Sequence, residues 1–229
     1  MPLSLNGRID GTVPLLARPR CPIMESCMQL DRNGYYDLPP GKIAALVTYL
    51  EMIEPPPVRP VPELAGLALR RVAEPDLDWY RGLFRRIGTD WLWFGRLVMS
   101  DDEVLATIRH PMVEVYALMQ DGQDEGLLEL DRREPPDIEL AYFGVTEAMQ
   151  GQGAGRWLMD RALQHAWAHR PGRVRVHTCS LDHPGALAFY IRSGFRPYRR
   201  AVEVADDPRL IGLVPRDSAA WFPLIDPGA

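Results

Sequence analysis

A glycine-rich loop between a predicted strand and a predicted helix constrains the fold of this chain more than any other feature. The loop, Gln150–Gly155, reads QGQGAG, with glycine at every second position. Before it, Ile138–Val145 (IELAYFGV) has the β-branched and aromatic residues of a strand. After it, apolar residues recur at helical spacing to about His169. Such a junction leaves backbone N–H groups free at the start of a helix, which predicts a phosphate-binding site.

Two nucleotide-binding motifs do not fit this loop. A dinucleotide fingerprint requires G-x-G-x-x-G/A. Counted from Gly151, the third glycine of that motif falls on Arg156, whose side chain would obstruct close packing of helix and strand. A P-loop ends in GK[ST], and the only Gly-Lys pair, Gly41-Lys42, is followed by Ile43. The spacing therefore excludes both motifs.

The remaining pattern, Gln150-x-x-Gly153-x-Gly155, resembles the acyl-CoA signature Q/R-x-x-G-x-G/A of the GNAT-type N-acetyltransferase superfamily. In that family a strand-ending valine stands five residues upstream, and here Val145 has this place. Downstream, His183–Phe195 (HPGALAFYIRSGF) is similar to the family's N-x-x-A-x-x-x-Y-x-x-x-G-F. The resemblance extends over about residues 64–204. It does not obviously include the residues on either side.

The resemblance and the pattern of expected elements imply an α+β fold, with a GNAT-like, mixed, mostly antiparallel central sheet flanked by helices. The expected strands are 67–72, 113–120, 127–133, 138–145, 173–179 and 195–204. The expected helices are 74–88, 100–111, the segment after the glycine loop, and 183–194. In the second helix Ser100 and Glu103 are spaced as a capping box.

By the same resemblance, the ligand of the loop would be acetyl-CoA, the acyl donor. Its pyrophosphate would bind the first turn of the helix, and its pantetheine arm would contact backbone groups of the preceding strand. The residues expected to bind it are Phe143, Val145, Gln150, Gly151, Gln152, Gly153, Ala154, Gly155, Arg156, His183 and Ala186. His183 stands where the family usually has asparagine. Its imidazole would make one hydrogen bond to the pantetheine, and a helix-capping role is the alternative.

Two residues are expected to catalyse the transfer. Tyr190 occupies the family's general-acid position, from which a phenol can protonate the leaving thiolate. Glu139, on the strand before the loop, is the expected base, acting directly or through water. An ammonium group with a pKa near 10.4 needs such help to lose its proton near neutral pH. The alternatives are a buried aromatic residue for Tyr190 and a solvated strand residue for Glu139.

The acceptor site is expected where Trp91, Trp93 and Phe94 follow the first helix, because this segment lines that site in the family. An aromatic wall suits an apolar or cationic acceptor, although core packing is the alternative. A small molecule with a primary amine is therefore the expected acceptor. A protein N-acetyltransferase and a non-catalytic acyl-CoA-binding regulator remain open. Three histidines, His165, His169 and His177, have neither metal-ligand nor triad spacing and are interpreted as structural.

The composition of the chain restricts the classes of partner and ligand that it is expected to bind. A formal net charge of −5 argues against a nucleic-acid ligand, because phosphate backbones require clustered cations. No apolar run has the length of a membrane span. The three cysteines show no metal-ligand spacing and fit a reducing compartment, so a cytoplasmic, bacterial protein without a metal site is expected. A homodimer is left open.

The distribution of proline along the sequence predicts the domain boundaries. Half of the 22 prolines fall within the first 62 residues. This shift predicts a proline-rich, partly structured N-terminal extension over residues 1–63, an acetyltransferase domain over 64–205 and a C-terminal tail over 206–229. Within the extension, only Gly34–Met52 has the composition to form a strand or a short helix.

Overall fold

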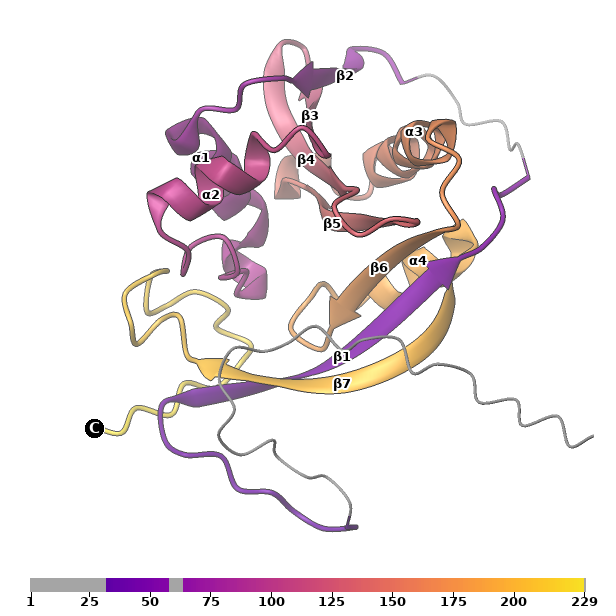
Figure 1. The fold of residues 1–229 in the computed structure, drawn as a ribbon. Coiled ribbons are helices and arrows are strands. Elements are labelled where there is room, and N and C mark those ends of the chain that lie inside the picture. Colours follow the sequence, from indigo (N-terminus) through magenta and orange to yellow (C-terminus); the bar gives the residue numbers. More distant parts are fainter. Residues whose placement is uncertain (1–31, 58–63, 229) are drawn as a thin grey trace, which may run out of the picture. The chain divides into compact units, whose positions relative to one another are not determined.

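The computed structural model describes residues 32–57 and 64–228. The chain divides after Asp37: residues 32–37 are exposed coil, and every helix and strand belongs to the unit that begins at Leu38. Seven strands form its sheet (Figure 1). They are β1 (Lys42–Met52), β2 (Leu67–Val72), β3 (Val113–Gln120), β4 (Gln123–Asp131), β5 (Asp137–Val145), β6 (Arg173–Cys179) and β7 (Arg196–Asp206). The helices are α1 (Leu77–Gly88), α2 (Asp101–Ile108), α3 (Ala154–Ala168) and α4 (Ala186–Ser193).

The strand order is β2-β3-β4-β5-β6-β1-β7, and every neighbouring pair is antiparallel except β5 and β6. The expected mixed, mostly antiparallel sheet is therefore confirmed. The expected elements from 67 onward are all present, with shifted ends. The capping box at α2 is also confirmed, because the Ser100 side chain accepts from the Glu103 N–H while the Glu103 carboxylate accepts from the Ser100 N–H.

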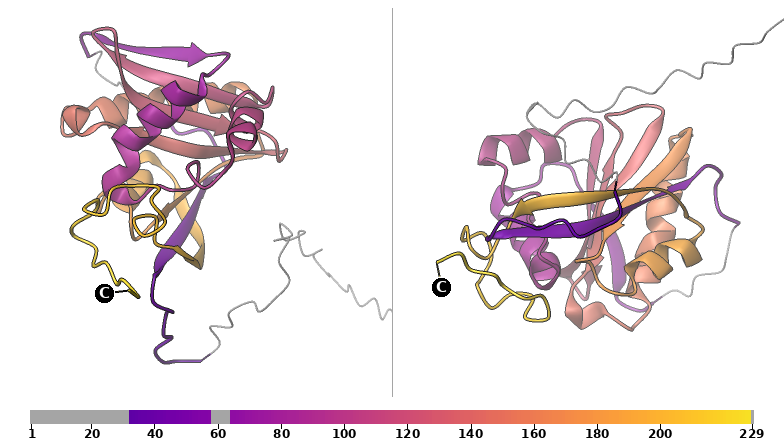
Figure 2. Two further views of the ribbon diagram at one scale, coloured as in Figure 1. Left: turned by 90° about the vertical axis from the view of Figure 1, so that its left-hand side faces the viewer. Right: turned by 90° about the horizontal axis from the view of Figure 1, so that it is seen from below.

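Helices cover both faces of the sheet (Figures 1 and 2). On one face, α3 and α4 bury residues such as Leu158 and Tyr190 against β5 and β6. On the other face, α1 and α2 bury residues such as Phe84 and Val104. Side chains alternate between the two faces along each strand. Leu140 belongs to the α3/α4 core, whereas Tyr142, beyond a shift in register, packs against the α1/α2 core.

One difference concerns the expected domain boundaries. The segment expected to form part of an extension contributes β1, which pairs with β6 on one side and β7 on the other. Residues such as Leu50 and Met52 are buried in the core. The boundary expected after residue 63 therefore does not separate β1 from the sheet, because its alternating apolar residues complete the same core. Residues 1–31, which hold the first prolines, lie outside the described residues.

The C-terminal tail also packs against the domain. Val214 and Ala219 are buried beside the α1/α2 core. Directly after β7, Asp207 and Arg209 form an ion pair of 2.7 Å whose side chains are only 3% and 2% exposed. Arg209 also donates to the carbonyl of Phe222 at 2.8 Å. The pair thus fixes the path of the tail.

Removing one partner of this buried pair is expected to destabilise the fold. Arg209→Ala should lower the free energy of unfolding by about 3–5 kcal/mol, because it leaves the Asp207 carboxylate buried without its partner. Arg216→Ala is the control, since Arg216 pairs with Asp226 near the surface and such pairs contribute about 1 kcal/mol or less. Urea denaturation of both variants measures the difference. Equal losses would show that the Asp207–Arg209 pair does not anchor the tail.

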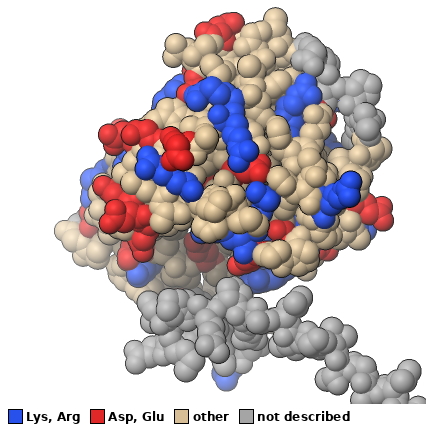
Figure 3. Space-filling view, turned by 45° about the horizontal axis from the view of Figure 1, so that its top comes forward, with Lys and Arg blue, Asp and Glu red and all other residues tan. Residues whose placement is uncertain are grey.

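Charged side chains of both signs are intermixed on the face shown in Figure 3, which offers no continuous basic surface. None of the helices in residues 32–57 and 64–228 combines the length and the apolar character that crossing a bilayer requires. In the same residues, no group of histidine, cysteine and carboxylate side chains is arranged to hold a metal ion.

Candidate active site

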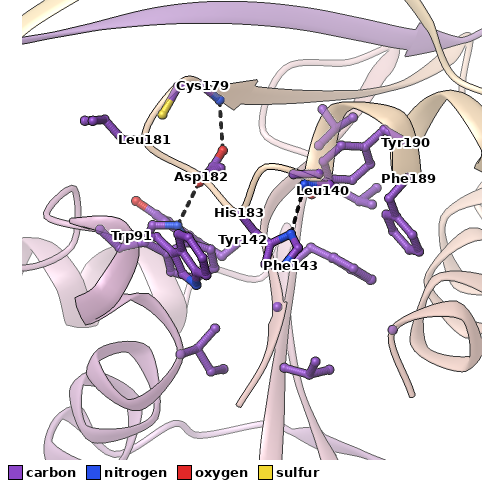
Figure 4. A pocket seen from close by; sticks show the side chains of 18 of the residues that line it. Trp91, Leu140, Tyr142, Phe143, Cys179, Leu181, Asp182, His183, Phe189 and Tyr190 are labelled. Atoms are coloured by element: carbon purple, nitrogen blue, oxygen red, sulfur yellow. Dashed lines mark hydrogen bonds between the residues drawn. The ribbon is translucent and has the colours of Figure 1, made fainter. Parts of the chain in front are cut away.

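The site begins where β5 and β6 diverge. The two parallel strands pair only from Asp137↔Arg173 to Glu139↔Arg175. Beyond this point β5 stays paired with β4, with a shift in register that leaves Ala141 without a partner. Such a bulge bends the strand and increases its twist. Between the separated strands lies a cavity of about 450 Å³ (Figure 4).

The glycine loop lies at one end of this cavity. Gly151 and Gly155 line it, and a Cβ added at either position would meet no atom within 4 Å. Gly151 and Gly153 have φ values of +73° and +85°, a conformation that favours glycine. Gly153 is the N-cap of α3 and supplies no side-chain cap. The first N–H groups of the helix therefore have no intrahelical partner and can bind an anion.

Aromatic side chains line the cavity on the α3/α4 face of the sheet. Phe143 stacks on Phe189 with a centroid distance of 5.8 Å and contacts the ring of Tyr190 edge-on. Tyr190 lies on α4 and is only 7% exposed. Its burial, together with the nearby Asp182 carboxylate, raises the pKa of the phenol well above its ordinary value. Tyr190 is therefore protonated at neutral pH and can donate a proton.

Aromatic side chains also line the cavity on the opposite, α1/α2 face. The Trp93 ring lies 5.5 Å from that of Tyr142 and donates from Nε1 to Asp182 at 3.0 Å. Asp182 also accepts from the backbone N–H of Cys179 at 2.8 Å. Gly144 is required beside this wall, because a Cβ there would lie 2.6 Å from a methyl group of Ile87.

The Trp91 end of this wall contacts the C-terminal tail. The Trp91 ring lies 5.1 Å from that of His183, in an edge-on arrangement, and 6.2 Å from that of Trp221. Trp221 also donates from Nε1 to the carbonyl of Asp90 at 3.0 Å. Nδ1 of His183 accepts from the N–H of Gly185 at 2.9 Å, which shapes the turn before α4.

The carboxylate of Glu139 does not line the cavity. It pairs with Arg175 at 3.1 Å and contacts Nδ1 of His177 at 3.2 Å. Burial alone would raise the pKa of Glu139, but the hydrogen bond from His177 and the charge of Arg175 hold it below its ordinary value. His177 itself lines the cavity. The hydrogen bond to Glu139 raises the pKa of His177 above its ordinary value, although partial burial opposes this shift.

The structure brings most of the expected site residues to this one cavity. Those that line it are Trp91, Trp93, Phe94, Phe143, Val145, Gln150, Gly151, Gly155, His183, Ala186 and Tyr190. Those that do not line it are Glu139, Gln152, Gly153, Ala154 and Arg156. Among these, the Gln152 side chain turns back to the carbonyl of Ala148, and Ala154 is buried.

Several cavity residues were not expected from the sequence. They include Tyr142, His177, Cys179, Phe189 and Glu203. His177 was interpreted as structural, yet it faces the cavity and contacts Glu139. The alternation of RVRVHTC places His177 on the same face of β6 as Arg175. The pairing of β5 with β6, which brings Glu139 beside them, is not visible in the sequence.

The chain was compared with protein families, with curated proteins and with solved structures. A family model described as "Acetyltransferase (GNAT) family" matches residues 66–195. A mycothiol acetyltransferase from Jonesia denitrificans is 40% identical over 79 residues, which are 34% of this chain and 24% of that protein. This chain therefore spans about a quarter of the length of that relative.

Two solved structures are similar to this chain. A GCN5-related N-acetyltransferase from Sphaerobacter thermophilus is 17% identical with a TM-score of 0.50, over 73% of this chain and 52% of that one. An IAA acetyltransferase from Bacillus cereus is 20% identical with a TM-score of 0.46, over 58% of this chain and 79% of that one. The likeness to the Sphaerobacter thermophilus protein concerns the fold alone.

Proposed function

The chain belongs to the acetyltransferase (GNAT) family, whose model matches more than half of it, and we propose that it transfers an acetyl group from acetyl-CoA to a primary amine of a small molecule. The observation that carries this proposal is that one continuous cavity between β5 and β6 joins the glycine loop to the aromatic wall. A donor held at the loop and an acceptor held at the wall would meet in the gap between the two strands.

The donor would bind on the α3/α4 side. Phosphate oxygens of acetyl-CoA suit the free N–H groups at the start of α3, where glycine at 151 and 155 leaves room for them. The separated edge of β5, from Leu140 to Val145, has no β6 partner for its backbone groups. These groups would hold the pantetheine arm, as expected for Phe143 and Val145. Glycine at 155 keeps the helix start open to the ligand.

The acceptor would bind on the α1/α2 side. Trp91, Trp93 and Phe94 line this part of the cavity together with Tyr142. Aromatic faces attract cations, and the exposed Glu203 carboxylate adds negative charge. An aromatic wall of this kind favours a small amine, whereas a protein N-acetyltransferase would require a flat, acidic acceptor groove. The second candidate function is a non-catalytic regulator that binds acyl-CoA. Such a protein would use the same glycine loop but would not transfer the acyl group.

Tyr190 would act as the general acid. Its phenol lines the cavity on the donor side and holds its proton at neutral pH. As the C–S bond of the thioester breaks, the sulfur gains a negative charge and would take this proton.

An assay of thiol release tests the proposal. The full chain is incubated with acetyl-CoA and a panel of alkyl, aryl and amino-acid primary amines, and free CoA is measured with a thiol reagent. Amine-dependent release, together with an acetylated amine in the mass spectrum, is the expected result. Tight acetyl-CoA binding without release by any amine would favour the regulator instead.

A further inference from the structure

We infer that His177 is the base that deprotonates the acceptor amine, and that Glu139 is a positioning residue behind it. This inference rests on the proposed function. The sequence favours Glu139 as the base, but its carboxylate does not line the cavity and is already paired with Arg175 and His177. His177 stands between Glu139 and the cavity.

His177 lies on the face of the sheet that is assigned to the acceptor. His177 is opposite Tyr49 in the pairing of β6 with β1, and the two rings lie 5.6 Å apart. Val176, the preceding residue, points to the α3/α4 core, so His177 points to the other face. That face carries Trp93 and Tyr142, the wall assigned to the acceptor. Tyr190 lies on the donor face, so the base and the acid approach the gap from opposite sides.

The hydrogen bond to Glu139 defines the chemistry of the ring. Nδ1 lies 3.2 Å from Oε1 of Glu139 and donates its proton to the carboxylate. In the neutral ring, Nε2 then carries the lone pair. The Glu139 carboxylate holds the ring in place and stabilises the imidazolium that forms. Imidazole is the side chain whose ordinary pKa lies closest to neutrality, and general base catalysis is most effective when the pKa of the base is near the pH of the reaction.

The proton balance is complete with these two residues. Nε2 of His177 takes one proton from the ammonium group, and the amine nitrogen forms a C–N bond to the acetyl carbon. The C–S bond breaks, and the thiolate takes the proton of the Tyr190 hydroxyl. The second proton of the nitrogen returns to the Tyr190 oxygen, while the imidazolium releases its proton to water. One proton is therefore released for each acetyl group transferred.

The charges around His177 decide the sign of its pH dependence. Glu139 on β5, Asp182 after β6 and Glu203 on β7 favour the imidazolium. Arg175 shares the Glu139 carboxylate, and Arg199 lies over the Tyr49 ring at 4.4 Å. Below its pKa His177 is protonated and cannot accept a proton. Activity should therefore rise as the pH rises through the pKa of His177.

The test compares His177→Gln with His169→Gln, in which the replaced histidine also lies beside a glutamate, 2.9 Å from Glu114, but outside the cavity. With the best amine of the panel, His177→Gln should lower kcat at least tenfold and remove the acidic limb of the pH–rate profile. His169→Gln should behave as the wild type. Thermal midpoints of both variants identify any loss of folding.

An independent readout is the titration of the five histidine rings, followed by ¹H–¹⁵N NMR of the full chain. The signal lost in His177→Gln should titrate above the ordinary pKa in the wild type, and Glu139→Gln should lower that pKa. An active wild type whose profile is unchanged in His177→Gln would overturn the inference alone, as would a pKa unmoved by Glu139→Gln. A wild type inactive with every amine would overturn the proposed function, and the role of His177 with it.

Discussion

Tyr190→Phe is expected to lower kcat at least tenfold while acetyl-CoA binding stays unchanged. General acid–base catalysis typically contributes about 10²–10⁴-fold to a rate. Removing the hydroxyl leaves the thiolate without its proton donor, so the loss should appear in turnover. The ring itself should remain in place, because it packs edge-on against Phe143 and Phe195. No described residue forms a hydrogen bond with the Tyr190 hydroxyl, so phenylalanine breaks none within that part of the chain.

The matched control is Tyr198→Phe, which removes a phenol on β7 that does not line the cavity. Steady-state kinetics give kcat, and isothermal titration calorimetry gives the Kd of acetyl-CoA for both variants. Unchanged turnover in Tyr190→Phe would remove this residue from the acid role. Loss of acetyl-CoA binding would assign it to the donor site instead.

Gly155→Leu is expected to raise the Kd of acetyl-CoA at least a hundredfold. The leucine side chain would enter the cavity beside the free N–H groups of the first turn of α3. A hydrogen bond to a charged group contributes about 1.5–3 kcal/mol. Losing two of them corresponds to a hundredfold or more, since 1.4 kcal/mol is a factor of ten. The fold should tolerate leucine, because the space is open and leucine favours a helix over glycine.

Gly82→Leu provides the control for this experiment. Gly82 also lies within a helix, α1, and an added Cβ there also meets no atom within 4 Å. It does not line the cavity. Both variants should keep or raise the thermal midpoint, and only Gly155→Leu should lose acetyl-CoA binding in calorimetry. Wild-type affinity in Gly155→Leu would show that the donor phosphates bind elsewhere.

Much of the fold was accessible from local patterns in the sequence. The alternation in Arg173–Cys179 predicts a strand, and Ser100 with Glu103 predicts a helix start, because both signals arise from neighbouring residues. The place of β1 was not accessible in this way. Its residues have the composition of a strand, but its insertion between β6 and β7 depends on partners more than 100 residues away in the sequence.

In the candidate site, too, features that depend on neighbouring residues were predicted, and features that depend on distant residues were not. The glycine loop and Tyr190 were predicted because each belongs to a contiguous motif with fixed spacing, and both line the cavity. His177 was missed because its significance depends on a contact with Glu139, 38 positions away in the sequence. The contact of Trp221 with the cavity residue Trp91 was missed for a similar reason. Its ring contacts Trp91 where the tail returns to the domain, held by Arg209 at the Phe222 carbonyl and by the Trp221 ring at the Asp90 carbonyl.

The most direct test of the account is a crystal structure of the full chain with CoA. We expect the pyrophosphate within hydrogen-bond distance of backbone N–H groups of residues 151–156, and the pantetheine along the edge of β5 that β6 leaves free. The CoA sulfur should then lie in the gap between the strands, within hydrogen-bond reach of the Tyr190 hydroxyl. CoA bound outside this cavity, or with its sulfur remote from Tyr190, would contradict the account.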